Sequence, residues 1–117
     1  MTGHIFKTIR EPDSLEDWFV LETDKGYYEL RLGGLNKVKN KTANKVLSLP
    51  FSNIRIARVL TDNFAVAIEL DNAQYIVHSD TFITSDGETS FEIKVVDKEI
   101  IENDDGLEGM IPIELRD

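Results

Sequence analysis

The chain has 117 residues, 22 of them acidic and 13 basic, which gives a formal net charge of −9 at neutral pH. Its length fits a single domain, and 41% apolar residues are enough for a hydrophobic core without a metal or a cofactor. Because cysteine is absent, disulfides, thiolate metal sites and thiol nucleophiles are excluded. The sequence shows no signal-peptide pattern and no apolar run long enough to cross a membrane, so we expect a soluble cytoplasmic protein.

The first third of the chain predicts a short helical turn and a β-hairpin. Ser14 and Asp17 have the spacing of a capping box and predict one helical turn. The stretches WFVLET and YYELRL are rich in aromatic and β-branched residues, and TDKG separates them. Gly26 in this separator can adopt the positive φ that a tight turn requires. In the second stretch, Tyr28 and Leu30 fall on one face of the strand.

Residues 53–97 predict a run of antiparallel strands, a meander. The stretches NIRIARVL, FAVAIEL, QYIVHS, FITS and SFEIKVV are rich in β-forming residues with period-2 alternation. The separators TDN, LDNAQ and SDGET carry the short polar residues and glycine that suit tight turns. The final stretch MIPIELR also alternates, but Pro112 has no N–H for a ladder, so this strand should lie at a sheet edge.

Helical signals are weak in the rest of the chain. Residues 36–47 have the length of a short helix, but three asparagines and a threonine lower their helical preference. We interpret residues 98–109 as an acidic, irregular and solvated connection. The predicted fold class is mainly β, or α+β if one short helix forms. The antiparallel meander should form a small sandwich or a half-open barrel, in one domain over residues 1–117.

The stretch His78-Ser79-Asp80 places three residue types of a catalytic triad side by side, but adjacency is the wrong geometry. In a strand His78 and Asp80 share a face and Ser79 points the other way, so the hydroxyl cannot reach the ring. We interpret His78 as a partly exposed structural histidine where a strand runs into a turn. The alternative is a hydrolase in which His78 is the base and Asp80 orients it.

Two stretches resemble ligand-binding loops and fail in detail. When Gly106 is aligned with the glycine of a calcium-binding loop, Ile101 falls on the first ligand position. Pro112 then falls on the last position, where a bidentate Glu is required. The pair Gly33-Gly34 is not followed by the Lys-Ser/Thr of a phosphate-binding loop. We therefore predict neither a metal nor a cofactor.

Charges are segregated along the sequence. Residues 1–29 hold 3 basic and 7 acidic residues, residues 30–61 hold 7 basic and no acidic ones, and residues 62–117 hold 3 basic and 15 acidic ones. One explanation is neutralisation within the fold. Arg58, which shares a predicted strand face with Ile56 and Leu60, needs a carboxylate opposite it. The sequence leaves open whether four lysines pair internally or contact a partner: Lys37, Lys39, Lys41 and Lys45.

The alternative explanations of the charge pattern involve a partner. A basic loop can track phosphates, but the net negative charge and the lack of aromatic residues between Leu35 and Pro50 argue against nucleic acid. Strong negative charge in residues 62–117 would instead steer a basic protein towards the chain. We therefore predict a non-catalytic protein-interaction domain, such as an inhibitor or immunity-type protein that binds a basic protein.

Aromatic anchors and acidic side chains near the C-terminus are the candidate binding residues. They are Trp18, Tyr27, Tyr75, Asp97, Glu99, Glu102, Asp104 and Asp105. A second hypothesis is a small-ligand or carbohydrate-binding β-domain whose ligand lies near Trp18 or Tyr75. The hydrolase that uses His78 and Asp80 is the third. An exposed strand edge also leaves a homodimer open.

Overall fold

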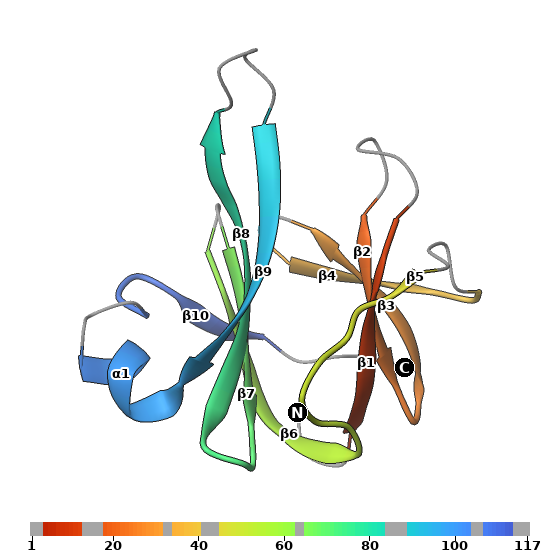
Figure 1. The fold of residues 1–117 in the computed structure, drawn as a ribbon, viewed down its shortest axis with the longest axis horizontal. Coiled ribbons are helices and arrows are strands. Elements are labelled where there is room, and N and C mark those ends of the chain that lie inside the picture. Colours follow the sequence, from red (N-terminus) through yellow and green to blue (C-terminus); the bar gives the residue numbers. More distant parts are fainter. Residues whose placement is uncertain are drawn as a thin grey trace.

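The computed structural model describes residues 4–12, 18–31, 34–40, 45–62, 65–83, 89–103 and 107–113. Over this part of the chain, ten strands form one sheet and a short helix follows the ninth strand (Figure 1). The elements are β1 (Ile5–Glu11), β2 (Phe19–Thr23), β3 (Gly26–Arg31), β4 (Gly34–Val38), β5 (Lys45–Val46), β6 (Ile54–Thr61), β7 (Ala65–Leu70), β8 (Gln74–Ile83), β9 (Thr89–Asp97), α1 (Lys98–Asn103) and β10 (Ile111–Ile113).

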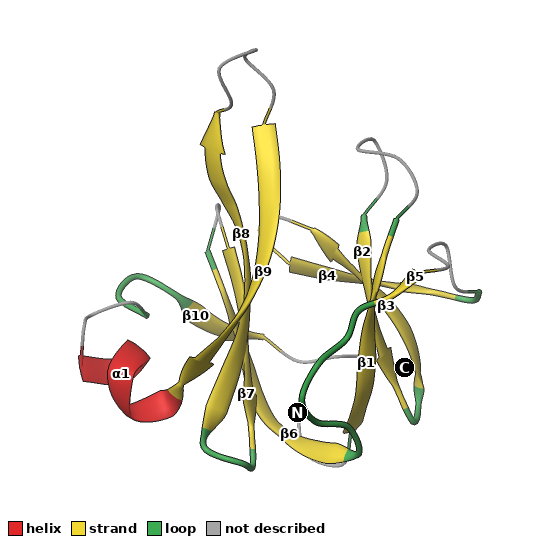
Figure 2. Cartoon of the chain, in the orientation of Figure 1, coloured by secondary structure: helices red, strands yellow, loops and turns green. Residues whose placement is uncertain are grey.

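The strands follow the order β4-β3-β2-β1-β6-β7-β8-β9, with β5 paired to β1 and β10 paired to β6. Every pair is antiparallel, so the predicted antiparallel meander is confirmed. The first half of the sheet (β1 to β5) and the second half (β6 to β10) meet where the start of β6 pairs with the start of β1 (Figure 2). The end strands β4 and β9 each pair with one neighbour, so the sheet is not closed into a barrel.

Of the two predicted turns that the structure describes in full, the β2–β3 turn has its positive φ at the predicted residue and the β7–β8 turn does not. Gly26 has a φ of +146° and closes the β2–β3 hairpin, in which it pairs with Thr23. The positive φ favours glycine here, and a β-carbon at Gly26 would also meet the end of the flexible Lys37 side chain at 3.3 Å. In the β7–β8 turn the positive φ, 63°, falls on Ala73. The predicted turn at 84–88 and the helical turn at 14–17 lie outside the described residues.

The main core lies between the two halves of the sheet. Alternate residues of each strand point into it, as the period-2 pattern of β7 illustrates with Val66, Ile68 and Leu70. Both halves contribute fully buried side chains to this one core: Phe6, Ile9, Leu21, Tyr28, Leu30, Ile56, Val59, Val66, Ile68, Leu70 and Ile76. The two halves therefore stabilise each other across a shared apolar layer.

A second apolar cluster lies on the outer face of the second half, beneath α1. Leu60, Ala67 and Tyr75 from the strands contact Ile101 of the helix, and Leu107 packs against them. The prediction of an irregular connection over residues 98–109 is therefore wrong for its first part. A six-residue helix has little stability of its own, but burial of Ile101 on an apolar sheet face supplies what its sequence does not.

The structure also tests the predictions for residues 36–47 and for Pro112. The weak helix considered for residues 36–47 does not form at its described ends, which belong to β4 and β5. The predicted edge position of Pro112 is confirmed, because β10 pairs with β6 alone and places Pro112 opposite Leu60. A residue without an N–H is tolerated at such an edge.

Candidate functional site

Five polar side chains meet on the outer face of the second half, under α1. Glu69 of β7 lies at the centre, with a side chain that is 11% exposed. Its Oε1 accepts hydrogen bonds from Arg58 Nε at 2.6 Å and from the Tyr75 hydroxyl at 2.9 Å, and its Oε2 accepts one from Lys98 Nζ at 3.1 Å. Glu102 of α1 lies 3.5 Å from Arg58 and 3.3 Å from the Tyr75 hydroxyl. We call these five residues the Glu69 cluster.

A β-bulge in β6 explains why Arg58 reaches this cluster. The register of β6 against β7 shifts between Ile56 and Arg58, which leaves Ala57 as the extra residue. Ile56 therefore points into the main core, while Arg58 and Leu60 point outwards. The predicted carboxylate partner of Arg58 is present as Glu69, but the prediction that Arg58 shares a face with Ile56 is wrong because of this bulge.

The environment of the cluster shifts the pKa values of Glu69, Tyr75 and Lys98. Burial acts to raise the pKa of Glu69, but hydrogen bonds from Arg58, Lys98 and Tyr75 outweigh it and lower the pKa below its ordinary 4.5. Burial raises the pKa of Tyr75 to about 12. The hydrogen bond to Glu69 raises the pKa of Lys98. Glu69 is thus a carboxylate, Arg58 and Lys98 are cations and Tyr75 is a neutral phenol at neutral pH, an arrangement suited to fastening α1 to the sheet.

The outward side of α1 presents a different chemistry. Ile101, Lys98 and Glu102 contact the sheet or the Glu69 cluster, whereas Glu99, Ile100 and Asn103 are exposed. Ile100 is 54% exposed, a large value for an isoleucine. Glu99 forms no ion pair with any described residue. Asp97, just before the helix, is exposed and accepts a 3.4 Å hydrogen bond from Gln74. We call Asp97, Glu99, Ile100 and Glu102 the α1 surface.

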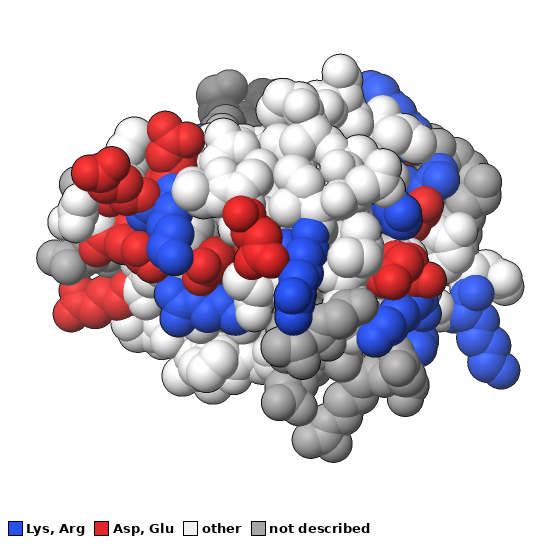
Figure 3. Space-filling model, turned by 90° about the horizontal axis from the view of Figure 1, so that it is seen from below, with Lys and Arg blue, Asp and Glu red and all other residues white. Residues whose placement is uncertain are grey.

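Acidic side chains gather at the end of the molecule that carries α1. Figure 3, a view from below, shows Asp and Glu concentrated at that end, with Lys and Arg more numerous towards the first half of the sheet. The structure therefore brings together three of the predicted acidic binding residues, Asp97, Glu99 and Glu102. The other two, Asp104 and Asp105, lie outside the described residues.

The predicted aromatic anchors do not come together. Tyr75 is fully buried beneath α1, so it is not an exposed anchor and cannot hold a ligand on an open sheet face. Trp18 and Tyr27 are half-buried and belong to the first half of the sheet. The Arg31 guanidinium lies 5.3 Å from the Trp18 ring centroid in cation–π geometry, which occupies one face of the indole.

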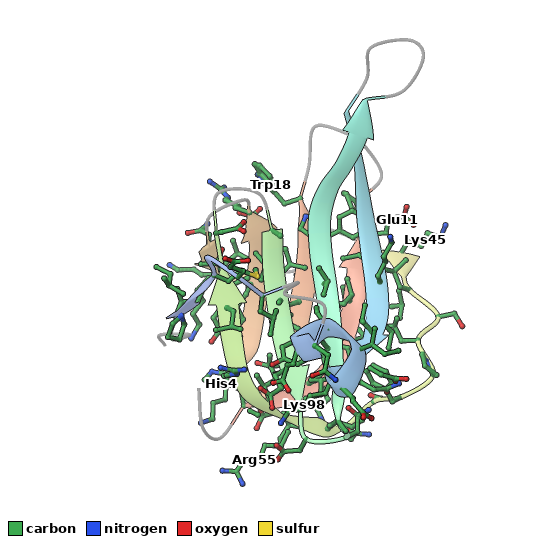
Figure 4. All side chains as sticks on the ribbon, turned by 90° about the vertical axis from the view of Figure 1, so that its left-hand side faces the viewer. His4, Glu11, Trp18, Lys45, Arg55 and Lys98 are labelled. Carbon is green, nitrogen blue, oxygen red and sulfur yellow. The ribbon has the colours of Figure 1, made fainter. Side chains whose placement is uncertain are left out.

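Most of the basic segment over residues 30–61 is neutralised within the fold. Among the described residues, its ion pairs include Arg31–Glu29, Lys45–Glu11, Arg55–Asp71 and Arg58–Glu69, at 2.9, 3.2, 4.0 and 2.6 Å. Figure 4 labels Lys45 with Glu11 at one side and Arg55 at the base of the second half. Lys37 Nζ lies 5.9 Å from the Tyr28 ring, Lys39 is exposed, and Lys41 lies outside the described residues.

His78 lies inside the molecule rather than near a strand end. It is 2% exposed in the middle of β8, and its ring centroid lies 5.2 Å from that of Phe19 in the opposite half. The prediction of a partly exposed histidine is therefore wrong, because β8 continues to Ile83. The side chain of Asp80 lies outside the described part. A histidine enclosed in the core gives the hydrolase hypothesis no support.

A surface hollow lies beside β1, and none of its lining residues belongs to the Glu69 cluster. Its volume is about 280 Å³. Side chains from β1, β5 and the segment after β5 line it: Lys7, Thr8, Val46, Leu47, Ser48, Leu49, Phe51 and Ser52.

Comparison with known proteins does not assign this site. No family model, curated protein or solved structure matches the chain. Among the described residues, no group of three or more metal-ligating side chains is placed to hold a metal ion. In the same part of the chain, no helix has the length and apolar character needed to span a membrane.

Proposed function

We propose that this chain is a non-catalytic interaction domain that binds a basic protein through the α1 surface. The observation that carries the proposal is the exposed Ile100, 54% accessible on a helix whose other isoleucine is buried. Helix packing has already satisfied Ile101, so Ile100 is left for a partner. An apolar anchor surrounded by charged residues is the usual anatomy of a protein interface.

The charges around Ile100 favour a basic partner. Arg58 and Lys98 are held by Glu69 under the helix, and Arg58 also lies 3.5 Å from Glu102, so the unbalanced negative charge of the α1 surface comes from Asp97 and Glu99. Asp97 and Glu99 form no ion pair with a described residue, and acidic side chains gather at the end of the molecule that carries α1 (Figure 3). Such a field raises the association rate with a positively charged partner and weakens as salt increases.

The proposal has two finer parts. An inhibitor or immunity-type protein that covers a basic surface of its target fits a small acidic domain of this shape. A cytoplasmic location belongs to the same proposal, and the absence of cysteine is compatible with a reducing compartment.

The test is a capture experiment with variants at α1 and matched controls elsewhere. The chain is immobilised, exposed to lysate of its source cells at low and high salt, and the retained proteins are identified by mass spectrometry. Glu99→Lys and Ile100→Asp change the α1 surface. Glu11→Lys and Val46→Asp make the same chemical changes in the first half of the sheet. The Glu11 side chain is 37% exposed, and Val46 is 51% exposed.

We expect a protein of high isoelectric point that is retained at low salt and bound through α1. Glu99→Lys should slow its association about threefold to tenfold at low salt, and Ile100→Asp should weaken the complex about tenfold or more. The two controls should bind as the parent chain does. Equal binding by all four variants, or retention of acidic proteins alone, would refute the proposal.

A further inference from the structure

The hollow beside β1 exists because the chain leaves the sheet between two fixed points. At one end, Leu47 N–H donates to the Ile9 carbonyl at 2.9 Å, continuing the β5–β1 pairing. At the other end, the Ser52 hydroxyl donates to the Lys7 carbonyl at 2.7 Å. Pro50 lies between them and has no N–H with which to continue a ladder. The segment 48–51 therefore arches over the edge of β1 and encloses space.

The walls of the hollow are apolar and firmly backed. Leu47, Leu49 and Phe51 are half-buried and pack against the main core, and the Phe51 ring centroid lies 5.8 Å from that of Phe6. Val46 is 51% exposed, and among the described residues only two other large hydrophobic side chains are more exposed. Burial of exposed apolar surface lowers the free energy, so binding of an apolar ligand over these side chains would be favourable.

Lys7 gives the hollow a cation that no carboxylate of the described residues neutralises. Its Nζ donates to Asn53 Oδ1 at 2.5 Å, and it forms no ion pair with any described residue. Other cations nearby are neutralised, as Lys45 is by Glu11 and Arg10 is by Glu22. The chain has a net charge of −9, yet this cation of the hollow is held by a neutral amide. Its charge is complementary to that of a small anion.

We propose that this hollow binds a small monocarboxylate with an apolar body, such as a medium-chain fatty acid. The carboxylate would lie against Lys7, and the hydroxyls of Ser48 and Thr8 line the same hollow. The apolar body would lie on Leu49 and Phe51. The volume, about 280 Å³, is at the lower end for ligand sites and suits a ligand smaller than a typical drug. This site is separate from the α1 surface and does not depend on the proposed partner.

The probe is octanoate, titrated into the full chain and followed by backbone amide shifts. We expect a dissociation constant on the order of 1 mM, with shifts confined to residues 7–8 and 46–52. Lys7→Gln should weaken binding about five- to tenfold, whereas Lys7→Arg should keep most of it. Val46→Glu should also weaken it by like-charge repulsion. The control Lys45→Gln removes a neighbouring cation that is already paired with Glu11, so its affinity should be unchanged.

Two further ligands test whether the carboxylate is recognised and whether it comes from a fatty acid or from the end of a protein chain. Octanol should bind more weakly than octanoate, because Lys7 then contacts no charge. A tripeptide ending in leucine with a free carboxyl group carries the same chemistry at a protein chain end; binding tighter than that of octanoate would overturn the assignment to a free fatty acid. Equal binding of octanol and octanoate, or an unchanged affinity in a folded Lys7→Gln variant, would overturn the proposal. So would shifts that cluster at α1 instead.

Discussion

Glu29 and Glu69 are equally buried, each 8% exposed, but the two halves of the sheet hold them differently. Glu29 of β3 accepts hydrogen bonds from Arg31 at 2.9 Å and Asn36 at 3.2 Å, both on its own half of the sheet. Glu69 accepts three, and the donor Lys98 comes from α1 rather than from a strand. The first carboxylate joins neighbouring strands, and the second fastens a helix to the sheet.

This difference shows how similar charges take different roles. On the first half, ion pairs such as Arg10–Glu22 cross between strands, and none of the described residues of this half forms a helix over them. On the second half, α1 covers the face, so Tyr75 is removed from water and Glu69 depends on its protein donors. We therefore expect substitutions in the second half to have the larger effects.

The largest effect should come from the core that both halves share. Ile68→Ala leaves a cavity at a side chain that is 1% exposed, and should lower the free energy of unfolding by about 3 kcal/mol. Urea unfolding monitored by far-UV circular dichroism measures it. Ile100→Ala is the matched control, and its 54% exposed side chain should cost less than about 0.5 kcal/mol. Equal losses would show that the core is not placed as described.

The second effect is a loss of stability at alkaline pH, to which the buried Tyr75 of the second half contributes. Its pKa is 10.0 ordinarily and about 12 in the folded chain, so between these values the unfolded state loses a proton that the folded state keeps. Stability is therefore complete below pH 10 and falls as pH rises towards 12, by about 2 kcal/mol from this group. Urea midpoints across that range should fall less steeply for Tyr75→Phe. An identical slope in the two proteins would contradict the burial of this phenol.

The third effect tests the two carboxylates directly. Glu69→Gln leaves Arg58 and Lys98 without their common acceptor charge and should destabilise the chain by about 2 kcal/mol. Glu29→Gln should cost about half as much, because Glu29 accepts from one cation and a neutral amide, whereas Glu69 accepts from two cations and a phenol. Urea unfolding of both variants at pH 7 gives the difference. A larger loss at Glu29 would reverse the comparison.

The smallest effect is expected at the loosest ion pair. Arg55 and Asp71 are 4.0 Å apart, with side chains that are 55% and 51% exposed. Arg55→Ala should therefore change the free energy of unfolding by less than about 0.5 kcal/mol. Thermal unfolding at two salt concentrations provides the measurement, and a loss of more than 1 kcal/mol would mean that this turn is more buried than its exposure indicates.

The sequence was sufficient where local chemistry decides the structure. Period-2 alternation in residues 65–70 predicted the core face of β7, Gly26 predicted the β2–β3 turn, and Pro112 predicted an edge strand. The need of Arg58 for a carboxylate was also readable, because a charge on an apolar strand face requires a partner.

The remaining features depend on contacts that no local pattern carries. Ile100 and Ile101 are adjacent, and only the sheet face under α1 decides which is buried. The sequence around Ala57 does not predict a bulge, but the bulge moves Arg58 to the outer face. Tyr75 lies on the strand face opposite Ile76 and would be exposed without the helix that covers it. The acidic residues of the candidate site could therefore be named from the sequence, but its apolar anchor, Ile100, could not.

The measurement that tests the docking proposal most directly is hydrogen exchange of the chain with and without its captured basic partner at low salt. We expect that amides of residues 97–103 become protected in the complex, while those of residues 46–52 and of β3 exchange as in the free chain. Protection confined to the first half of the sheet, with no change at α1, would contradict it.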